Sequence, residues 1–427
     1  MKLAALESVV VVGGSLAGVR AGESLRNYGY KGNLSIISGE SALPYERPPL
    51  SKQVISSNWD FSRVTITNKY EDSMNFYRGI FARALDLNSR TVLLTNDREL
   101  HFDGLVIACG ASPRILNLPI ETAGPQAIPT DMVMGQDAPP TNLFALRTFD
   151  DAIRIRESAI NSSRVVIIGA GFIGLEISSS LASLGLDVTV IDPAATLLSR
   201  AIGESFSSYF ETLASQKGVC LKLGRTPKSF KVTNSGKITQ VLLDNDESCD
   251  ADFVVYGIGV KPATEWLESS NISLHERDRG VVCDATCAVL DKNGRPLDTV
   301  VGCGDVAWFH HELFDENMRI EHFENAVSMA QAAAKRLLGL SDARIPYLDV
   351  PFFWSDLFGL KLQFVGRQYS DSKVDIVEGD LASNKFLALF HHQGVVTGAL
   401  GVGRPARIVA MRNMIAQRAS LDDAMGR

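Results

Sequence analysis

The stretch RVVIIGAGFIGLE, residues 164–176, decides the fold of this chain. Its apolar run over residues 165–168 is β-branched and uninterrupted, as in a parallel strand that is covered on both faces. Gly169, Gly171 and Gly174 follow at GxGxxG spacing, which permits a tight turn, close approach of a pyrophosphate and close packing of the next helix. The stretch therefore predicts a strand, a turn and a helix that together bind a dinucleotide.

The residues that follow these glycines complete the unit. The helix should have one apolar face, formed by Ile173, Ile177, Leu181 and Leu184. A second strand over residues 188–191 leads to Asp192, where an acid can accept a hydrogen bond from a ribose hydroxyl. An acid at this position repels a 2′-phosphate, and no arginine or lysine follows it before Arg200. The sequence therefore favours NADH over NADPH.

Composition and charge limit the other possibilities. A chain of 427 residues with ordinary composition allows two or three domains, and its net charge of −7 argues against a general partner among nucleic acids or anionic membranes. No apolar run is long enough to span a bilayer, and Glu7 makes a signal peptide at the N-terminus unexpected. We expect a cytoplasmic protein whose six cysteines, without a CxxC pair, are free thiols: Cys109, Cys220, Cys249, Cys283, Cys287 and Cys303.

The stretch VVVVGGSLAG near the N-terminus repeats the same pattern with one change. Gly13 and Gly18 stand at the expected positions, but Ser15 replaces the middle glycine, where a Cβ atom crowds an approaching backbone. A further strand over residues 34–37 ends near Glu40, an acid placed to hold a ribose. Two such units in one chain predict two bound dinucleotides.

A proline-rich loop lies between the two units. The stretch PYERPPLSK, residues 44–52, has three prolines, which exclude a helix interior and favour an extended or turning backbone. Such a loop could present Arg47 and Lys52 as fixed cations, or it could be an ordinary solvated surface loop.

At this point the chain resembles the FAD-dependent ferredoxin reductases, which include the putidaredoxin-reductase-like and biphenyl-dioxygenase-reductase-like enzymes of the pyridine nucleotide–disulfide oxidoreductase superfamily. The resemblance covers nearly the whole chain. Besides the three stretches already quoted, its motifs are LVIACGASPR (105–114), LRTFDDA (146–152), VVYGIGVKPATEWL (254–267), VVGCGDVAWF (300–309), RIEHFENA (319–326) and PFFWSDLFGLKLQ (351–363).

The resemblance implies an α/β fold with two Rossmann-like dinucleotide-binding domains, as in glutathione reductase, and a C-terminal α+β domain. The implied boundaries are 1–117 and 249–326 for the two parts of the FAD-binding domain, 118–248 for the NAD-binding domain and 327–427 for the C-terminal domain. NADH would give a hydride to FAD, which would pass single electrons to an iron–sulfur ferredoxin that serves a haem monooxygenase or a ring-hydroxylating oxygenase. The protein would be a monomer or a homodimer.

The resemblance also implies the site residues. FAD would be bound by Gly13, Ser15, Ala17, Gly18, Glu40, Arg47, Lys52, Ala82, Arg114, Arg147, Gly304, Asp305 and Phe323. NAD(H) would be bound by Gly169, Gly171, Ile173, Gly174, Glu176, Asp192, Arg200, Ile258 and Gly259. Lys52 and Glu176 would approach the flavin N5 edge, the lysine favouring the reduced ring and the glutamate orienting the carboxamide. Neither would need to act as a general acid or base, because hydride transfer moves no free proton, and no metal is implied.

Four residues depart from the pattern of the family. Ser15, Cys109, Phe323 and Met329 stand where relatives commonly have glycine, threonine, tryptophan and glutamine. These changes bear on the tuning of the cofactor more than on its identity. Asp305 could instead cap a helix, and the segment 119–141 is interpreted as a linker or added loop without an assigned function.

Two other functions remain open at this point. A flavin NADH oxidase or disulfide-type reductase would use the same cofactors without a ferredoxin, but the region where those reductases carry a redox CxxxxC has no cysteine. A non-enzymatic FAD-binding protein that resembles apoptosis-inducing factor would need a basic surface. The acidic balance of the chain disfavours it.

The end of the chain predicts a separate smaller unit. Apolar runs over residues 386–390 and 395–400, joined by HHQG, indicate a hairpin in which the histidines face solvent rather than a metal. Residues 404–418 contain four arginines and no acid. They indicate either a solvated helix face or a docking rim for an acidic ferredoxin.

Overall fold

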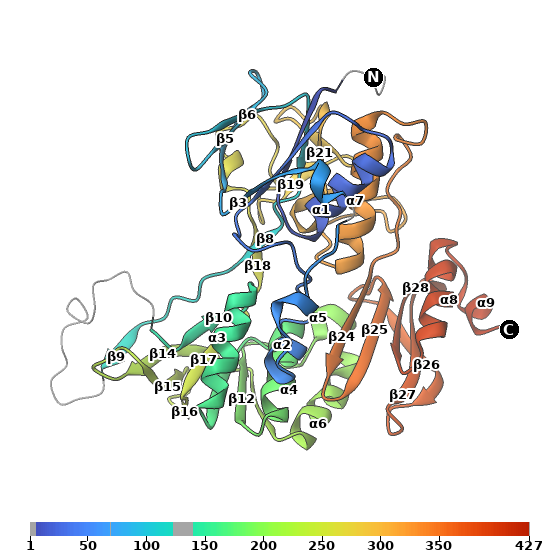
Figure 1. Cartoon of the computed structure of the whole chain (residues 1–427). Helices are drawn as coiled ribbons and strands as arrows, with labels where there is room; N and C mark the ends of the chain where they lie inside the picture. Colours follow the sequence, from blue (N-terminus) through green and yellow to red (C-terminus); the bar gives the residue numbers. More distant parts are fainter. Residues whose placement is uncertain (1–5, 69, 123–139, 427) are drawn as a thin grey trace.

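The computed structural model describes residues 6–68, 70–122 and 140–426, which form three units (Figure 1). The first unit is built on β1 (Ser8–Val12), which lies between two parallel neighbours, β2 (Asn33–Ser38) and β7 (Gly104–Ile107). Its four valines are at most 4% exposed, because both faces of the sheet are covered.

Strands from far along the chain complete the first sheet. Its nine strands run in the order β23-β22-β19-β20-β21-β7-β1-β2-β3. The helices α1 (Leu16–Asn27) and α7 (Phe323–Leu338) pack against each other and share the hydrophobic core of this sheet. The added strands are β3 (Asn75–Arg78), β19 (Val281–Cys283), β20 (Ala288–Leu290), β21 (Pro296–Gly302), β22 (Ala307–His311) and β23 (Glu316–Met318). A separate antiparallel sheet contains β4 (Ala82–Asp86), β5 (Thr91–Leu94) and β6 (Glu99–His101).

The second unit confirms the strand, turn and helix predicted from residues 164–176. Strand β11 (Arg164–Ile168) lies between parallel β12 (Asp187–Asp192) and β17 (Phe253–Tyr256), and α4 (Phe172–Ser183) begins immediately after Gly171. The sheet is completed by β10 (Leu143–Ala145) and β13 (Val219–Leu223). The other helices of this unit are α3 (Phe149–Ile160), α5 (Ser199–Ile202) and α6 (Ser207–Gln216), whereas α2 (Gln53–Ser56) follows the proline-rich loop of the first unit.

One detail of the α4 prediction is wrong. Ile177 and Leu181 are fully buried, but Ile173 is 49% exposed and Leu184 is 44% exposed. Ile173 lies in the first turn and faces a cavity, and Leu184 lies beyond the helix as its C-cap residue. The apolar face of α4 is therefore shorter than its sequence period indicates.

A small sheet projects from the second unit. Strands β14 (Pro227–Val232), β15 (Ile238–Leu243) and β16 (Ser248–Asp250) are antiparallel, and β9 (Ile120–Thr122) pairs with β14 in parallel. The first residues of the expected linker over 119–141 are thus part of a sheet. Residues 123–139 of that segment lie outside the described residues.

The third unit confirms the predicted C-terminal α+β domain. Its antiparallel sheet has the order β24-β25-β28-β27-β26. The expected hairpin turns at Gln393 and Gly394, which both have positive φ. His391 and His392 lie in β27 rather than in the turn, and His391 Nε2 is 2.9 Å from Asp375, so they do not form a solvent-facing turn. The elements are β24 (Phe352–Leu357), β25 (Leu360–Gly366), β26 (Lys373–Asp380), β27 (Lys385–His392), β28 (Val395–Val402), α8 (Pro405–Ala416) and α9 (Leu421–Met425).

Strand pairing and packing shift two of the expected boundaries. Strand β16 spans the expected boundary at residue 248 and β17 lies beyond it, but both pair within the second unit. Helix α7 runs through residue 326 and packs in the first unit. We therefore propose that the first unit resumes after Tyr256 and ends with α7. Within the described residues, no helix is both long and apolar enough to cross a membrane.

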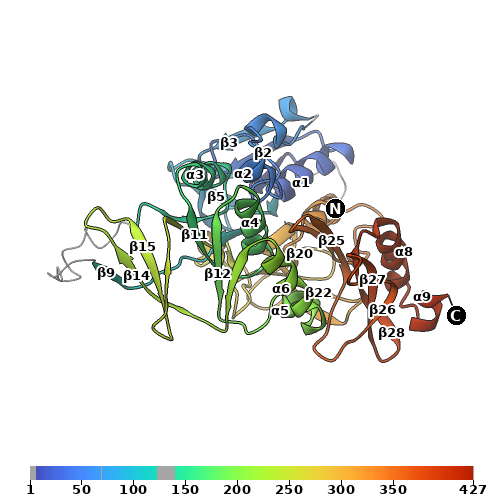
Figure 2. The same ribbon diagram turned by 90° about the horizontal axis from the view of Figure 1, so that it is seen from below.

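The third unit is joined to both other units. Figure 2 shows its sheet beside α5 and α6 of the second unit, and the ring of Phe206 stacks on that of Phe386 with centroids 5.7 Å apart in a shared core. Toward the first unit, Arg412 Nη1 is 2.7 Å from Glu324 Oε2 of α7. Arg367 Nε donates to Glu316 Oε2 at 2.9 Å.

The arginines of residues 404–418 all have partners in the structure. Arg412 pairs with Glu324, and Arg404 and Arg407 both contact Glu378. Arg418 Nη2 donates to the carbonyl oxygens of Glu312 and Leu313. Arg412 and Arg418 thus join the C-terminal domain to the first unit, whereas Arg404 and Arg407 pair within that domain. A docking rim for a ferredoxin at these arginines stays a prediction.

We predict that the pair Arg412 and Glu324 stabilises the contact between domains by roughly 0.5–1 kcal/mol, because both side chains are about one third exposed. A double-mutant cycle of Arg412→Ala and Glu324→Ala, measured by denaturant unfolding, should give this coupling energy. The same cycle on Arg83 and Asp97, a more exposed pair, should give a smaller value. No coupling at low salt between Arg412 and Glu324 would contradict the prediction.

Candidate functional site

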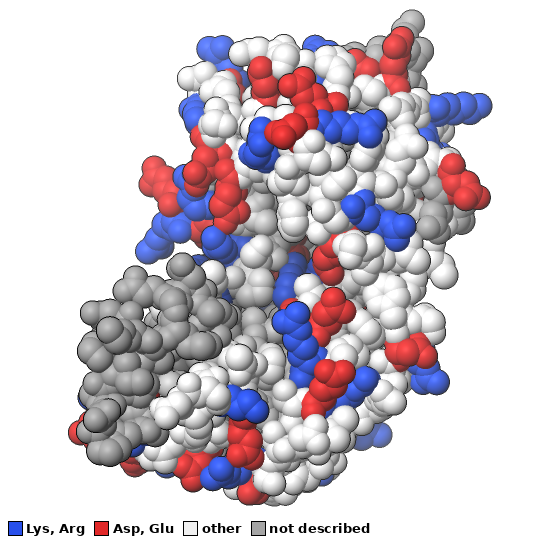
Figure 3. Space-filling view, turned by 60° about the vertical axis from the view of Figure 1, so that its left-hand side comes forward, with Lys and Arg blue, Asp and Glu red and all other residues white. Residues whose placement is uncertain are grey.

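One cavity of about 1080 Å³ joins the first and second units and reaches the third. Figure 3 shows the hollow between the units, with basic side chains inside it. A cavity of this size exceeds the usual range for a drug-sized ligand. The predicted site residues that line it are Gly13, Ser15, Ala17, Glu40, Arg47, Lys52, Ala82, Arg114, Arg147, Gly171, Ile173, Glu176, Ile258, Gly259, Asp305 and Phe323.

The other predicted site residues are Arg200, Gly304 and four residues of the glycine turns. Arg200 is in α5, and its side chain lies outside the described part of the structure. Gly304 has a positive φ, and a Cβ there would be 2.8 Å from the Cβ of Ala17. The others belong to the packing of the two glycine turns: Gly18, Gly169, Gly174 and Asp192.

The two glycine turns have the same construction. A Cβ on Gly18 would be 1.7 Å from the oxygen of Gly13, and a Cβ on Gly174 would be 1.9 Å from the oxygen of Gly169. These contacts bring each helix close to its strand. The third glycine of each motif is therefore required by protein packing.

The middle position of each turn is small for a different reason. A Cβ on Gly171 would meet nothing within 4 Å in the protein. The equivalent Ser15 is an N-cap residue with an extended backbone, and its hydroxyl makes no capping hydrogen bond. A small residue at this position leaves room in the cavity rather than in the core, which fits a ligand that approaches the backbone.

Asp192 braces the second turn. Its Oδ2 accepts a hydrogen bond from the backbone N–H of Ala170 at 2.6 Å, and its Oδ1 accepts one from Ala194 at 2.8 Å. The carboxylate is thus fixed at the end of β12, where the sequence predicted it. It lies beside the cavity and is not part of the wall.

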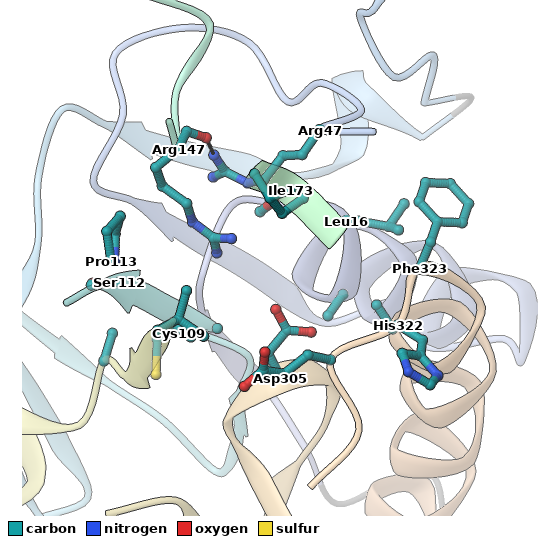
Figure 4. Close-up of a pocket in the computed structure, with 18 of the residues that line it drawn as sticks. Leu16, Arg47, Cys109, Ser112, Pro113, Arg147, Ile173, Asp305, His322 and Phe323 are labelled. Atoms are coloured by element: carbon teal, nitrogen blue, oxygen red, sulfur yellow. Dashed lines mark hydrogen bonds between the residues drawn. The ribbon is translucent and has the colours of Figure 1, made fainter. Parts of the chain in front are cut away.

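Two arginines meet in the cavity (Figure 4). Arg47 Nη1 donates to the carbonyl oxygen of Arg147, and Arg47 Nη2 is 2.6 Å from Glu40 Oε1. Burial lowers the pKa of Arg147, and the nearby positive charge of Arg47 lowers it further. Arg47 Nε is buried without a hydrogen-bond partner among the described residues. Paired guanidinium groups with free donors fit the pyrophosphate of a dinucleotide.

Asp305 lies across the cavity from Arg147 (Figure 4). Burial raises the pKa of its carboxyl, although Arg147 acts in the opposite direction. The residue lies inside a short 3-10 helix whose N-cap is Cys303. The alternative that Asp305 caps a helix is therefore wrong. Arg319 donates to its carbonyl oxygen at 2.9 Å and thereby fixes the backbone.

Lys52 and Glu176, predicted from separate motifs, form a buried ion pair. Lys52 Nζ is 2.8 Å from Glu176 Oε2. Two hydroxyl groups also donate hydrogen bonds to the Glu176 carboxylate: Ser51 Oγ donates to Oε2 at 2.5 Å, and Ser355 Oγ donates to Oε1 at 2.6 Å. The proline-rich loop therefore presents Lys52 as a fixed cation in the cavity and is not an ordinary surface loop.

Several residues of the site were not foreseen. Ser51 and Ser355 lie inside quoted motifs, but no spacing rule connects them to Glu176. Trp354 lies edge-on to Phe323, with ring centroids 5.6 Å apart, at the third unit's side of the cavity. The indole Nε1 of Trp266 is buried without a partner among the described residues. Trp354 belongs to the aromatic cluster of the quoted PFFWSDLFGLKLQ, and Trp266 lies in the quoted VVYGIGVKPATEWL.

The thiols show no sign of a redox site. All six cysteines are free. Burial raises the pKa of Cys109 and Cys303 to about 12 and also raises that of Cys283 and Cys287. Because the thiolate is the nucleophile, these four residues are poorly suited to disulfide chemistry.

Comparisons with known proteins agree with this arrangement. The family described as pyridine nucleotide-disulphide oxidoreductase matches residues 7–330, and the reductase C-terminal family matches residues 352–425. Putidaredoxin reductase of Pseudomonas putida is 30% identical over 422 residues, which cover 96% of this chain and 92% of that protein.

Solved structures extend the likeness. A covalent complex of putidaredoxin reductase with putidaredoxin has a TM-score of 0.87 at 28% identity, covering 99% of this chain and 96% of that one. A ferredoxin reductase from Rhodopseudomonas palustris gives 0.86 at 29% identity, with coverage of 97% and 96%. An NAD-dependent persulfide reductase from A. fulgidus, at 19% identity, shares the fold, with a TM-score of 0.81 and coverage of 97% and 78%.

His322 provides a test of the cavity wall. It lines the cavity beside Phe323, its Nδ1 is buried without a partner in the described structure, and its ring centroid is 5.1 Å from that of Phe353. Burial lowers its pKa to about 4, and the charge of Arg367 adds to this effect. The unfolded chain, with an ordinary histidine pKa of about 6.5, therefore binds more protons between pH 4 and 6.5.

We predict that His322 makes stability rise with pH across this window, and that its contribution, about 3 kcal/mol, is lost as the pH falls to 4. His322→Phe should flatten the free energy of unfolding between pH 4 and 6.5, measured with denaturant. His310→Asn, which changes a half-exposed histidine, should leave the slope unchanged. An identical slope in His322→Phe and the parent protein would refute the prediction.

Proposed function

This chain belongs to the pyridine nucleotide-disulphide oxidoreductase family, whose cofactors FAD and NADH it uses, and we propose that its electron acceptor is an iron–sulfur ferredoxin. The observation that carries the proposal is the single cavity that joins both glycine turns to the aromatic side chains of the C-terminal domain. A C-terminal domain of the reductase type covers the same cavity. The ferredoxin would in turn serve a haem monooxygenase or a ring-hydroxylating oxygenase.

The residues of the first unit would hold FAD. Bound FAD supplies the step from a two-electron donor to one-electron acceptors. Arg47 and Arg147 would bind its pyrophosphate, and Asp305 would accept hydrogen bonds from its ribityl hydroxyls. Phe323 would lie against the flavin ring. The smaller contributions would come from Gly13, Ser15, Ala17, Gly18, Glu40, Ala82, Arg114 and Gly304.

The residues of the second unit would hold NADH. Asp192 would accept from a ribose hydroxyl and disfavour a 2′-phosphate, so NADH would be preferred. The carboxylate of Glu176 would orient the nicotinamide carboxamide while Lys52 favours the electron-rich reduced flavin. Position rather than proton transfer would govern the rate. The other residues that would contact NADH are Gly169, Gly171, Ile173, Gly174, Arg200, Ile258 and Gly259.

The alternatives have less support. A disulfide-type reductase needs an accessible thiolate at the flavin, whereas burial raises the pKa of Cys109 to about 12. No observation in the described structure favours a non-enzymatic interaction protein. We also propose a cytoplasmic location, which free cysteines support. A monomer or homodimer remains our prediction.

The proposal is tested with the purified holoprotein, NADH and a panel of [2Fe–2S] ferredoxins. Cytochrome c reduction should depend on NADH and on one or more of these ferredoxins, whereas ferricyanide reduction should need no ferredoxin. Rapid turnover of oxygen or of a disulfide, with no ferredoxin stimulating cytochrome c reduction, would overturn the proposed acceptor.

We predict that Glu176→Gln slows flavin reduction by NADH about tenfold to a hundredfold, because a misplaced nicotinamide costs rate in this range. Stopped-flow absorbance at saturating NADH measures the effect. Glu157→Gln on the exposed face of α3 is the matched control and should reduce at the parent rate. If Glu176→Gln also reduces at that rate, the carboxylate has no role in hydride transfer.

A further inference from the structure

Phe81 is a large aromatic side chain that is 61% exposed and also lines the cavity. It precedes β4, and its backbone is fixed, because its N–H donates to Thr95 Oγ1 at 3.2 Å and its carbonyl oxygen accepts from the N–H of Thr95 at 2.9 Å. The ring is therefore held at the surface of the site by its backbone. Nothing in the sequence motifs or in the proposed cofactor contacts accounts for it.

Gly39 leaves the space that the ring occupies. A Cβ on Gly39 would be 2.1 Å from Cε1 of Phe81, so the ring occupies the space that any other residue at 39 would need. Backbone hydrogen bonds join the same segments: the N–H of Ile80 donates to the oxygen of Ser38 at 3.0 Å, and that of Gly79 donates to Glu40 at 3.1 Å. The ring of Phe81 thus lies directly beside the end of β2.

The end of β2 is where the adenosine half of the first dinucleotide is expected. In a Rossmann-like unit the acid after the second strand hydrogen-bonds the ribose, and here that acid is Glu40, the neighbour of Gly39. The base is attached to this ribose. It must therefore extend into the part of the cavity that is lined by Phe81 and Ala82.

We propose that Phe81 is the aromatic face on which the adenine of FAD stacks, with Gly39 left without a side chain so that the ring can take this position. Stacking of a base on an aromatic ring tolerates solvent on the other side, which accounts for the exposure of Phe81. The inference rests on FAD binding and is independent of the identity of the electron acceptor.

The test compares Phe81→Ala, Phe81→Leu and Phe81→Tyr with the parent, all as purified holoproteins. The first measurement is the dissociation constant of FAD, obtained from flavin fluorescence on dilution. Phe81→Ala and Phe81→Leu should both weaken FAD binding about tenfold, the lower part of the range for loss of one base stack. Phe81→Tyr, which keeps the aromatic face, should stay within about twofold of the parent. Ile160→Ala, at an exposed apolar residue outside the cavity, should have no effect.

The second measurement isolates the adenine. Each holoprotein is equilibrated with excess FMN, which lacks the adenosine half, and the exchange constant between bound FAD and bound FMN is determined. This constant should shift toward FMN by the same factor of about ten in Phe81→Ala and Phe81→Leu. The visible spectrum of the remaining bound FAD should be unchanged.

Three results would overturn the proposal. Unchanged FAD affinity in Phe81→Ala would mean that the ring does not contact the cofactor. Parent-like FAD affinity in Phe81→Leu would mean that the side chain acts by covering Gly39 and not by stacking on the adenine. An unchanged exchange constant despite weaker FAD binding would assign it to the fold. A failure to reduce any ferredoxin would refute the proposed acceptor and leave these measurements unaffected.

Discussion

The arrangement of the three units depends on one buried carboxylate, that of Glu176. A charge out of water is strongly destabilising unless it is paired and its remaining lone pairs are hydrogen-bonded. Its partners come from two other regions: Ser51 and Lys52 from the proline-rich loop, and Ser355 from the C-terminal sheet. The contacts of this carboxylate therefore join α4 to both the proline-rich loop and the C-terminal domain.

The positions of the two glycine turns differ in what requires a small residue. The last glycine of each motif is required by contact between helix and strand, whereas the middle position, Gly171 or Ser15, lines the cavity. This difference explains why the first turn tolerates Ser15. Because the glycines of the motif serve different purposes, the middle one can be replaced while the strand, turn and helix still form.

Elements that depend on residues near one another in the sequence could be predicted from the sequence. Strand β11, its turn, α4 and Asp192 followed from a contiguous stretch, and the hairpin of the C-terminal domain followed from two apolar runs. Contacts between distant residues had no such signal: Ser355 meets Glu176 across 179 positions, and Arg412 meets Glu324 across 88. For this reason the arginines of α8 were open to interpretation as a docking rim, and the boundary at residue 326 divided α7. The predicted site residues mostly came together, because motifs at strand ends converge on one edge of a sheet.

The buried thiols have a consequence for the working life of the protein. Reduced flavins react with oxygen and release peroxide, which oxidises thiolates far more readily than thiols. Cys303 precedes Gly304 and Asp305 directly, and Cys109 lines the cavity. Because burial raises the pKa of both thiols to about 12, they remain protonated at neutral pH. These two thiols, unlike the exposed Cys220, are therefore resistant to the peroxide that a bound reduced flavin would release on reaction with oxygen.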